Sequence, residues 1–251
     1  MQGNEDVEVV LSPTTFRRVV AAGTAVVSLA GLTVEALKSI YRWKGRGGVV
    51  PLLSLSHEQN VPTFYTALLF LLAASMSALL ATRSRERDRR DRFAWWGLCA
   101  GFFYISVDEV MELHEQWGRS FRLGGVLHFG WVVPAAGIVL VLAALYARFL
   151  LRLPSRIRNR LVLAGAIYVL GAVGMELPLG YWAEREGEKT LGYALIDWVE
   201  ETLEMVGISF FLFTAFDMLA AAGLRVRFGA RSPAKEREDE APAAELAKDD
   251  P

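Results

Sequence analysis

The sequence predicts an all-α integral membrane protein, a polytopic bundle of six transmembrane helices. Apolar residues make up 53% of the 251 residues, and they are concentrated in blocks of about 20, the length that crosses ~30 Å of hydrocarbon as a helix. Basic residues gather in a few short segments between these blocks. The blocks are continuous rather than alternating, which excludes the strands of a transmembrane barrel.

Each predicted helix corresponds to one apolar block, with proline placed where a missing backbone donor costs little. The first fifteen residues are acidic rather than basic, so we expect the first block to be a retained helix and not a cleaved signal peptide. Pro62, Pro134 and Pro178 fall near the ends of predicted helices. The predicted spans are Phe16–Ile40, Pro62–Thr82, Phe93–Leu113, His128–Leu150, Leu161–Trp182 and Ile196–Leu224.

The distribution of Lys and Arg predicts the orientation. Most of the 27 basic residues lie between the second and third spans, between the fourth and fifth, or beside the first and last. The positive-inside rule therefore places both termini in the cytoplasm, for a protein of the cell membrane. The basic segment from Lys38 to Arg46 opposes this assignment. We divide the chain into a cytoplasmic segment (1–15), a six-helix transmembrane domain (16–228) and a disordered cytoplasmic tail (229–251) rich in Ala, Pro, Glu, Asp and Lys.

Composition also limits the partners. The net charge of −1 argues against nucleic-acid binding, and the lipid bilayer is the partner that the apolar blocks require. Cys99 is the only cysteine, so neither an intrachain disulfide nor a cysteine zinc site is possible.

Acidic residues collect at the predicted outer ends of the third and sixth spans. At ~100° per residue, Asp108, Glu112 and Glu115 lie within about 60° on one helix face. The stretch from Asp197 to Glu204 carries four carboxylates within about 100°. Two such stripes at one depth need a counter-charge: a bound cation, outer arginines, or protons shared after upward pKa shifts.

These residues predict a divalent-metal site in the outer leaflet. Imidazole with carboxylate favours zinc, iron or manganese, and carboxylates alone favour calcium or magnesium. The competing interpretation is that these helix ends simply stand in water, where carboxylates cost little. The candidate ligands are Asp108, Glu112, Glu115, His114, Glu176, Glu201, Glu204, His57 and His128.

Two carboxylates lie deeper in the predicted spans. Glu176 has apolar or glycine neighbours on both sides and is expected to face the bundle interior and to pair there. Asp217 lies about 160° from the acidic stripe of its helix, and we expect it to pair with an arginine of an inner loop.

The sequence leaves three functions open. The first is a metal-binding protein, with a metal-dependent enzyme acting on a lipid-like substrate as one form of it. The second is a cation or proton transporter, which would need polar residues continuing to the inner side. The third is a structural or partner-binding membrane protein. Known metal patterns do not match: the paired histidines at i,i+4 of alkaline ceramidases are absent, and Glu112 and His114 are too close for the Glu-x-x-His motif of ferritin-like proteins.

Overall fold

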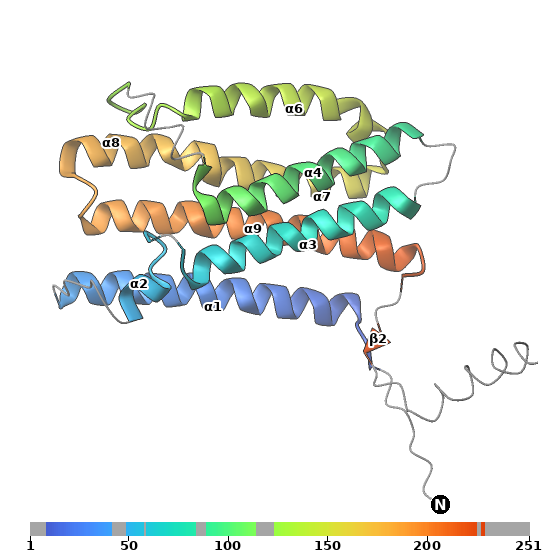
Figure 1. Ribbon diagram of the computed structural model, residues 1–251, viewed down its shortest axis with the longest axis horizontal. Helices are drawn as coiled ribbons and strands as arrows, with labels where there is room; N and C mark the ends of the chain where they lie inside the picture. The colour runs from blue at the N-terminus through green and yellow to red at the C-terminus, as the bar shows by residue number, and fades with distance from the viewer. Residues whose placement is uncertain are drawn as a thin grey trace, which may run out of the picture.

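The computed structural model describes residues 9–41, 49–57, 59–83, 89–113, 123–224 and 227–228. Within these residues the chain is almost entirely helical, in long and roughly antiparallel helices (Figure 1). The elements are β1 (Val9–Val10), α1 (Pro13–Ile40), α2 (Val49–Leu53), α3 (Val61–Arg83), α4 (Arg89–Met111), α6 (Val132–Arg152), α7 (Ser155–Val169), the π-helix η2 (Leu170–Met175), α8 (Glu176–Glu186), α9 (Leu191–Ala221) and β2 (Arg227–Phe228).

Side-chain caps mark the starts of three helices, α1, α3 and α9. The Ser12 hydroxyl accepts a hydrogen bond from the Thr15 amide at 3.0 Å and thereby caps α1. Asn60 caps α3 in the same way, and Thr190 caps α9. Each side-chain oxygen satisfies an amide that has no partner in the first helical turn.

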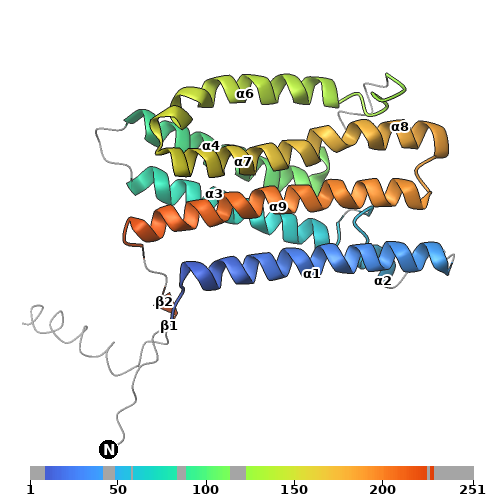
Figure 2. The same ribbon diagram turned by 180° about the vertical axis from the view of Figure 1, so that it is seen from behind.

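The helix α9 forms the centre of the bundle. It packs against α1, α3, α7 and η2, and Met205, Leu212 and Ala215 on it are fully buried. The helix α4 covers α3, and α6 lies at the far edge from α1 (Figures 1 and 2). Only Val132 and Phe149 of α6 are buried, so most of its apolar surface is free to face lipid.

Five helical segments are long and apolar enough to cross a membrane: α1, α3, α6, the continuous α7–η2–α8 rod, and α9. The remaining predicted span, the third, corresponds to α4, which has 23 residues but is less apolar than these five segments. Its apolar stretch contains Trp, Tyr and Gly and ends in Asp108 and Glu109, which lower its mean hydropathy. The structure therefore supports a multi-pass helical protein with five candidate spans.

Several predicted span boundaries differ from the helix ends in the structure, including the start of the fifth span, where the helix begins at Ser155 rather than Leu161. The third span ends at Met111, because Glu112 adopts φ = 54° and terminates the helix after donating its amide to Asp108. The fourth begins at Val132, so His128 lies in the preceding turn, where its amide bonds Gly125. The sixth begins five residues earlier than predicted, at Leu191, because Thr190 caps it there.

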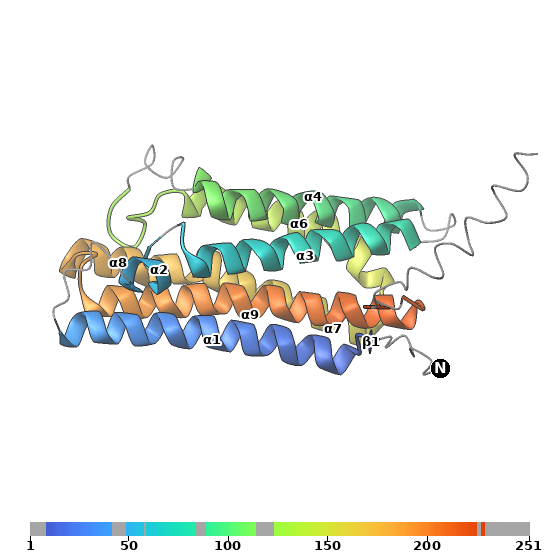
Figure 3. The ribbon, with the colours of Figure 1, turned by 60° about the horizontal axis from the view of Figure 1, so that its bottom comes forward.

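The two ends of the bundle domain meet. β1 and β2 pair antiparallel, with Val9 opposite Phe228 and Val10 opposite Arg227, as Figures 2 and 3 show at one end of the bundle. Both terminal flanks therefore lie at the same end, as the predicted topology requires. The tail from 229 to 251 lies outside the described residues.

That end also carries the partner predicted for Asp217. Arg160 of α7, in the predicted inner loop region, donates from Nη1 to Asp217 Oδ2 at 2.8 Å, and Arg17 of α1 donates to both carboxylate oxygens. The predicted ion pair is confirmed, and it is a triad rather than a pair.

Candidate functional site

The opposite end of the bundle, here called the polar end, carries the candidate site. It is formed by the C-terminal ends of α1 and α4, the segment between α2 and α3, η2 with the start of α8, and the first half of α9 (Figure 1). Its acidic residues come from four chain segments that are far apart in the sequence.

Carboxylates from α4 and α9 gather around one tyrosine of α7. Asp108 and Glu109 from α4 and Glu201 and Glu204 from α9 all act electrostatically on Tyr168. A second set surrounds Glu200, on which Glu176, Glu204 and Asp197 act. We define the carboxylate cluster as Asp108, Glu109, Glu176, Glu200, Glu201 and Glu204. Besides Glu200 itself, its members act on Tyr168 or on Glu200, with Glu204 common to both sets, although they derive from three separate helical segments.

The π-helix η2 brings Glu176 into this cluster. In a π-helix, residues five apart are joined by backbone hydrogen bonds and lie on one side, whereas α-helical geometry would set Gly171 and Glu176 about 140° apart. Gly171 faces α9 so closely that a Cβ there would lie 2.9 Å from the Glu200 carbonyl oxygen and 3.0 Å from Glu204 Cγ. The wide turn therefore directs Glu176 toward the same face of α9.

Two of these carboxylates are withdrawn from solvent. Glu200 and Glu176 are each 8% exposed, so neither stands in water as a simple helix extension would. The Trp131 indole donates from Nε1 to Glu176 Oε1 at 3.1 Å. Glu200 Oε2 is buried and, among the described residues, accepts no hydrogen bond. A buried carboxylate oxygen without a donor is costly unless a cation or a proton satisfies it.

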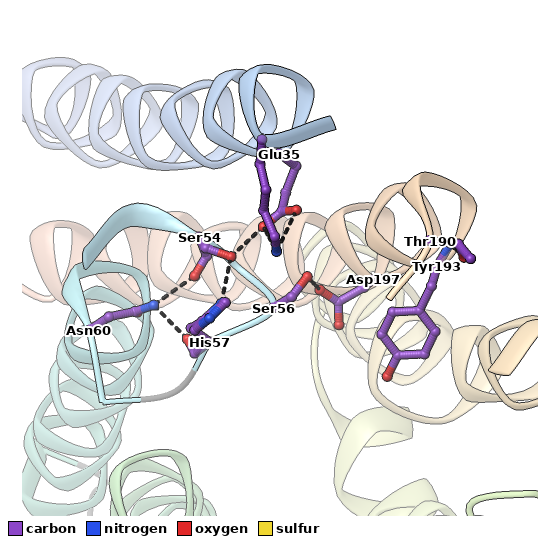
Figure 4. A network of polar contacts seen from close by, with 9 residues as sticks. Glu35, Ser54, Ser56, His57, Asn60, Thr190, Tyr193 and Asp197 are labelled. Carbon is purple, nitrogen blue, oxygen red and sulfur yellow. Dashed lines mark hydrogen bonds and ion pairs between the residues drawn. The ribbon is translucent and has the colours of Figure 1, made fainter. Parts of the chain in front are cut away.

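A short segment, Ser54–Asn60, connects the helices of the polar end by side-chain hydrogen bonds (Figure 4). Glu58 lies outside the described residues. Asn60 fixes the fold of the segment, because its amide nitrogen donates to the carbonyl of Ser54 at 2.6 Å and to that of His57. From this base, Ser56 donates to Asp197 of α9 at 2.6 Å, and Gln59 donates to Glu112 at 3.3 Å.

The same segment connects His57 to a buried carboxylate of α1. The Ser54 hydroxyl donates to Glu35, which is 2% exposed and also receives Lys38 Nζ at 3.1 Å. Ser54 Oγ lies 3.0 Å from His57 Nδ1. A hydroxyl has one proton, and Ser54 uses it in the hydrogen bond to Glu35. The contact with His57 therefore requires Nδ1–H to donate to Ser54 Oγ, which leaves the lone pair of the neutral ring on Nε2.

The environment of His57 favours that neutral ring. Partial burial and the positive charge of Lys38 lower the pKa of His57, while Glu35 opposes them. Lys38, the first basic residue of the segment Lys38–Arg46, is neutralised by Glu35, and the other basic residues of that segment lie outside the described residues.

Backbone strain coincides with the contact between this segment and α4. Among the described residues, Gln59 and Glu112 are the only non-glycine residues with positive φ, at 58° and 54°. Their side chains are hydrogen-bonded to each other. Such conformations cost roughly 1–3 kcal/mol and are concentrated at functional sites. Both strained residues thus lie at one junction of the polar end.

The predicted ligands separate into three groups. Asp108, Glu176, Glu201 and Glu204 belong to the carboxylate cluster, whereas His57 and Glu112 belong to the hydrogen-bonded segment beside it. His128 lies against α8, with its Nε2 3.9 Å from the exposed Glu188. His114 and Glu115 lie outside the described residues. Among the residues that are described, no three His, Cys, Asp or Glu side chains are grouped closely enough to hold a metal ion.

Several residues of the site carried no recognisable signal in the sequence. Ser54, Ser56 and Gln59 are ordinary loop residues, and Trp131 lies near the start of the predicted fourth span, where tryptophan is common at a membrane interface. Tyr168 resembles any tyrosine of an apolar span. The one available hint was the pair Gly171 and Gly174 just before Glu176, since glycine permits close helix approach.

Comparison with known proteins gives a family without an assigned activity. No functionally curated protein and no solved structure matches this chain. A family model described as a domain of unknown function, DUF8692, matches residues 18–218. The matched region runs from the second turn of α1 to the last turn of α9 and includes the whole carboxylate cluster. Because it covers about four-fifths of the 251 residues, the chain belongs to the DUF8692 family.

Proposed function

We propose that this protein binds a divalent cation at the carboxylate cluster, within a bundle that crosses the cell membrane six times with both termini in the cytoplasm. The observation that carries the proposal is Glu200. Its Oε2 is buried without a hydrogen-bond donor among the described residues, and its charged neighbours are three further acids, Glu176, Glu204 and Asp197. A cation shared with these neighbours would satisfy that oxygen and offset their repulsion.

Besides the five apolar segments, the additional crossing is α4, the third predicted span in chain order. With 23 residues it is as long as α3, and it packs along α3 more extensively than any other pair of elements. Phe103 and Tyr104 on its outer surface are more than half exposed. An even number of crossings also agrees with both terminal flanks lying at one end.

The ligand chemistry favours a hard cation. The described members of the cluster offer only carboxylate oxygens, which suit manganese, calcium or magnesium better than zinc. His57 is held by Ser54, and His128 lies against α8. His114 and Glu115, which follow α4 by three and four residues in the sequence and lie outside the described residues, are the additional ligands to test by substitution. Binding requires the carboxylates to close on the ion from their present spacing.

Titration of the purified full-length protein with Mn²⁺, Ca²⁺ and Zn²⁺ tests the proposal by calorimetry, with Mn²⁺ also followed by electron paramagnetic resonance. Glu200→Gln and Glu204→Gln should weaken Mn²⁺ binding by about tenfold or more, the cost of one charged ligand. Glu186→Gln is the matched control, because Glu186 is an exposed acid of α8. A wild-type protein that binds none of the three cations would overturn the proposal.

Proton transport is a second candidate, favoured by buried hydroxyls between α1, α3 and α9. Ser28 and Thr202 are joined at 2.7 Å, and Thr24 lies 3.1 Å from both Ser209 and Tyr65. Buried polar groups thus extend farther from the polar end than the sequence indicated. Hydroxyls of this kind also serve helix packing in membranes.

Proteoliposomes containing a pH-sensitive dye distinguish proton transport from a packing role of these hydroxyls. A transporter should acidify the lumen under an imposed gradient, and Thr202→Val should slow the flux. Thr33→Val is the control, because the exposed Thr33 hydroxyl donates to the Leu29 carbonyl of its own helix. Absence of flux in folded, oriented wild-type protein would remove this candidate.

A further inference from the structure

The ion triad at the end where the termini meet has more donors than acceptors. Arg17 contacts both oxygens of Asp217, and Arg160 contacts Oδ2 at 2.8 Å. The three residues come from α1, α7 and α9, so the triad ties together helices that are distant in sequence. Two guanidinium groups face one carboxylate, and the triad carries a net positive charge.

Arg17 has an unused donor at this position. Its Nε is buried and has no hydrogen-bond partner among the described residues. The side chains of Arg17 and Arg160 are nevertheless 40% and 38% exposed, so their outer N–H groups remain accessible. A guanidinium has several donors in a fixed plane, more than one shared carboxylate can accept from two arginines. An added anion would complete the arrangement.

The depth of the triad specifies the source of that anion. Arg17 is four residues after the start of α1, Arg160 five after the start of α7, and Asp217 four before the end of α9. At 1.5 Å per residue, the triad lies roughly 6–8 Å inside the helix ends. The 31 residues of α9 span about 46 Å, close to the ~40–45 Å of a bilayer with its headgroups. A position one turn inside such a helix is the level of lipid phosphates.

We propose that Arg17 and Arg160 form a binding site for the phosphate of an anionic membrane lipid. The phosphodiester oxygens accept hydrogen bonds from the guanidinium groups, and Asp217 holds both arginines in place while leaving one positive charge for the lipid. The planar guanidinium suits phosphate better than an ammonium would. This site is at the opposite end of the bundle from the carboxylate cluster and is independent of cation binding there.

Native mass spectrometry of the full-length protein in neutral detergent tests the site. The protein is titrated with phosphatidylglycerol and, separately, with zwitterionic phosphatidylcholine. Wild-type protein should retain phosphatidylglycerol about tenfold more tightly, and Arg17→Gln or Arg160→Gln should remove that preference, as expected for loss of a charge-assisted hydrogen bond. Asp217→Asn should strengthen phosphatidylglycerol binding, because it removes the competing negative charge while the amide oxygen of Asn still accepts a hydrogen bond from the arginines.

The matched control is Arg156→Gln, which removes an exposed positive charge one turn earlier on α7. It should leave the lipid preference unchanged, whereas a general attraction of anionic lipid to this end would make it equivalent to Arg160→Gln. Circular dichroism verifies that each variant is folded, and the two arginine variants test the site independently. Equal retention of both lipids by wild-type protein, or displacement of the lipid by millimolar inorganic phosphate, would overturn the assignment to a lipid.

Discussion

Replacing Gly171 by alanine should separate η2 from α9 at the carboxylate cluster. The new Cβ would lie 2.9 Å from the backbone oxygen of Glu200 and 3.1 Å from the backbone nitrogen of Glu204. Ordinary Cβ contacts begin at 3.4 Å, so the two segments must move apart by about 0.5 Å at that point. Neither neighbouring atom is the end of a flexible side chain that could turn away.

The free energy of unfolding should fall by up to about 2 kcal/mol. Overpacking of this kind costs roughly 1–3 kcal/mol, partly offset by the ~1 kcal/mol that alanine gains over glycine in a helix. Gly207→Ala should cost more, since its Cβ would meet the Tyr168 backbone nitrogen at 2.6 Å. Gly165→Ala is the control, because nothing lies within 4 Å of its Cβ.

Equilibrium unfolding in mixed micelles, followed by circular dichroism, gives the three free energies. The expected order of stability is Gly165→Ala, then Gly171→Ala, then Gly207→Ala. If cation binding occurs at the cluster, Gly171→Ala should also weaken Mn²⁺ affinity, whereas Gly165→Ala should not. A Gly171→Ala protein as stable as Gly165→Ala would refute the close contact between η2 and α9.

Three further predictions concern the polar end. Because the pKa of His57 is lowered in the folded state, the unfolded chain binds its proton more readily, so stability should fall as pH drops below about 6.5; His57→Gln should reduce this fall in unfolding titrations, and an unchanged pH dependence would contradict it. Ser54→Ala should cost about 1–3 kcal/mol, since it leaves the buried Glu35 without its hydroxyl donor; thermal unfolding checks this, and a neutral result would argue against the bond. Trp131→Phe should cost about 1 kcal/mol by removing the N–H donor to Glu176, with no loss expected for Trp96→Phe on the exposed surface of α4; equal losses would contradict a specific bond.

The sequence predicted most of the fold because membrane helices are specified by composition over a length. A block of about 20 apolar residues can satisfy its backbone hydrogen bonds in hydrocarbon only as a helix. Five of the predicted spans correspond to helices that are long and apolar enough to cross a membrane. Helix ends were harder, because they depend on single residues. Thr190 extended α9 by its cap, and the positive φ of Glu112 ended α4 early.

The candidate site could be predicted only where helical periodicity holds. Asp108, Glu201 and Glu204 were assigned to facing stripes from their spacing, and the structure brings these three around Tyr168. Glu112 was assigned to the same stripe and lies beyond it, because the helix stops one residue before. Asp217 was separated from the stripe by the same angular argument, and its pairing with Arg160 is confirmed.

Contacts made by loops could not be predicted, since no periodicity describes them. The segment Ser54–Asn60 reaches Glu35, Asp197 and Glu112 on three different helices. Each of these bonds depends on how the segment is folded by Asn60. Serine and glutamine side chains have no sequence pattern that identifies a distant carboxylate as their acceptor.

The wide turn of η2 sets the rotation with which α8 enters the polar end. If Leu170–Met175 were wound as a regular α-helix with no residue removed, the same six residues would turn through a larger total angle than they do in the π-helix. Every residue from Glu176 onward would then rotate by about 100° about the helix axis. Glu176 would turn away from α9, and Trp131 would lose its acceptor. The π-turn of η2 thus sets the rotation of α8, and this rotation decides which carboxylates meet.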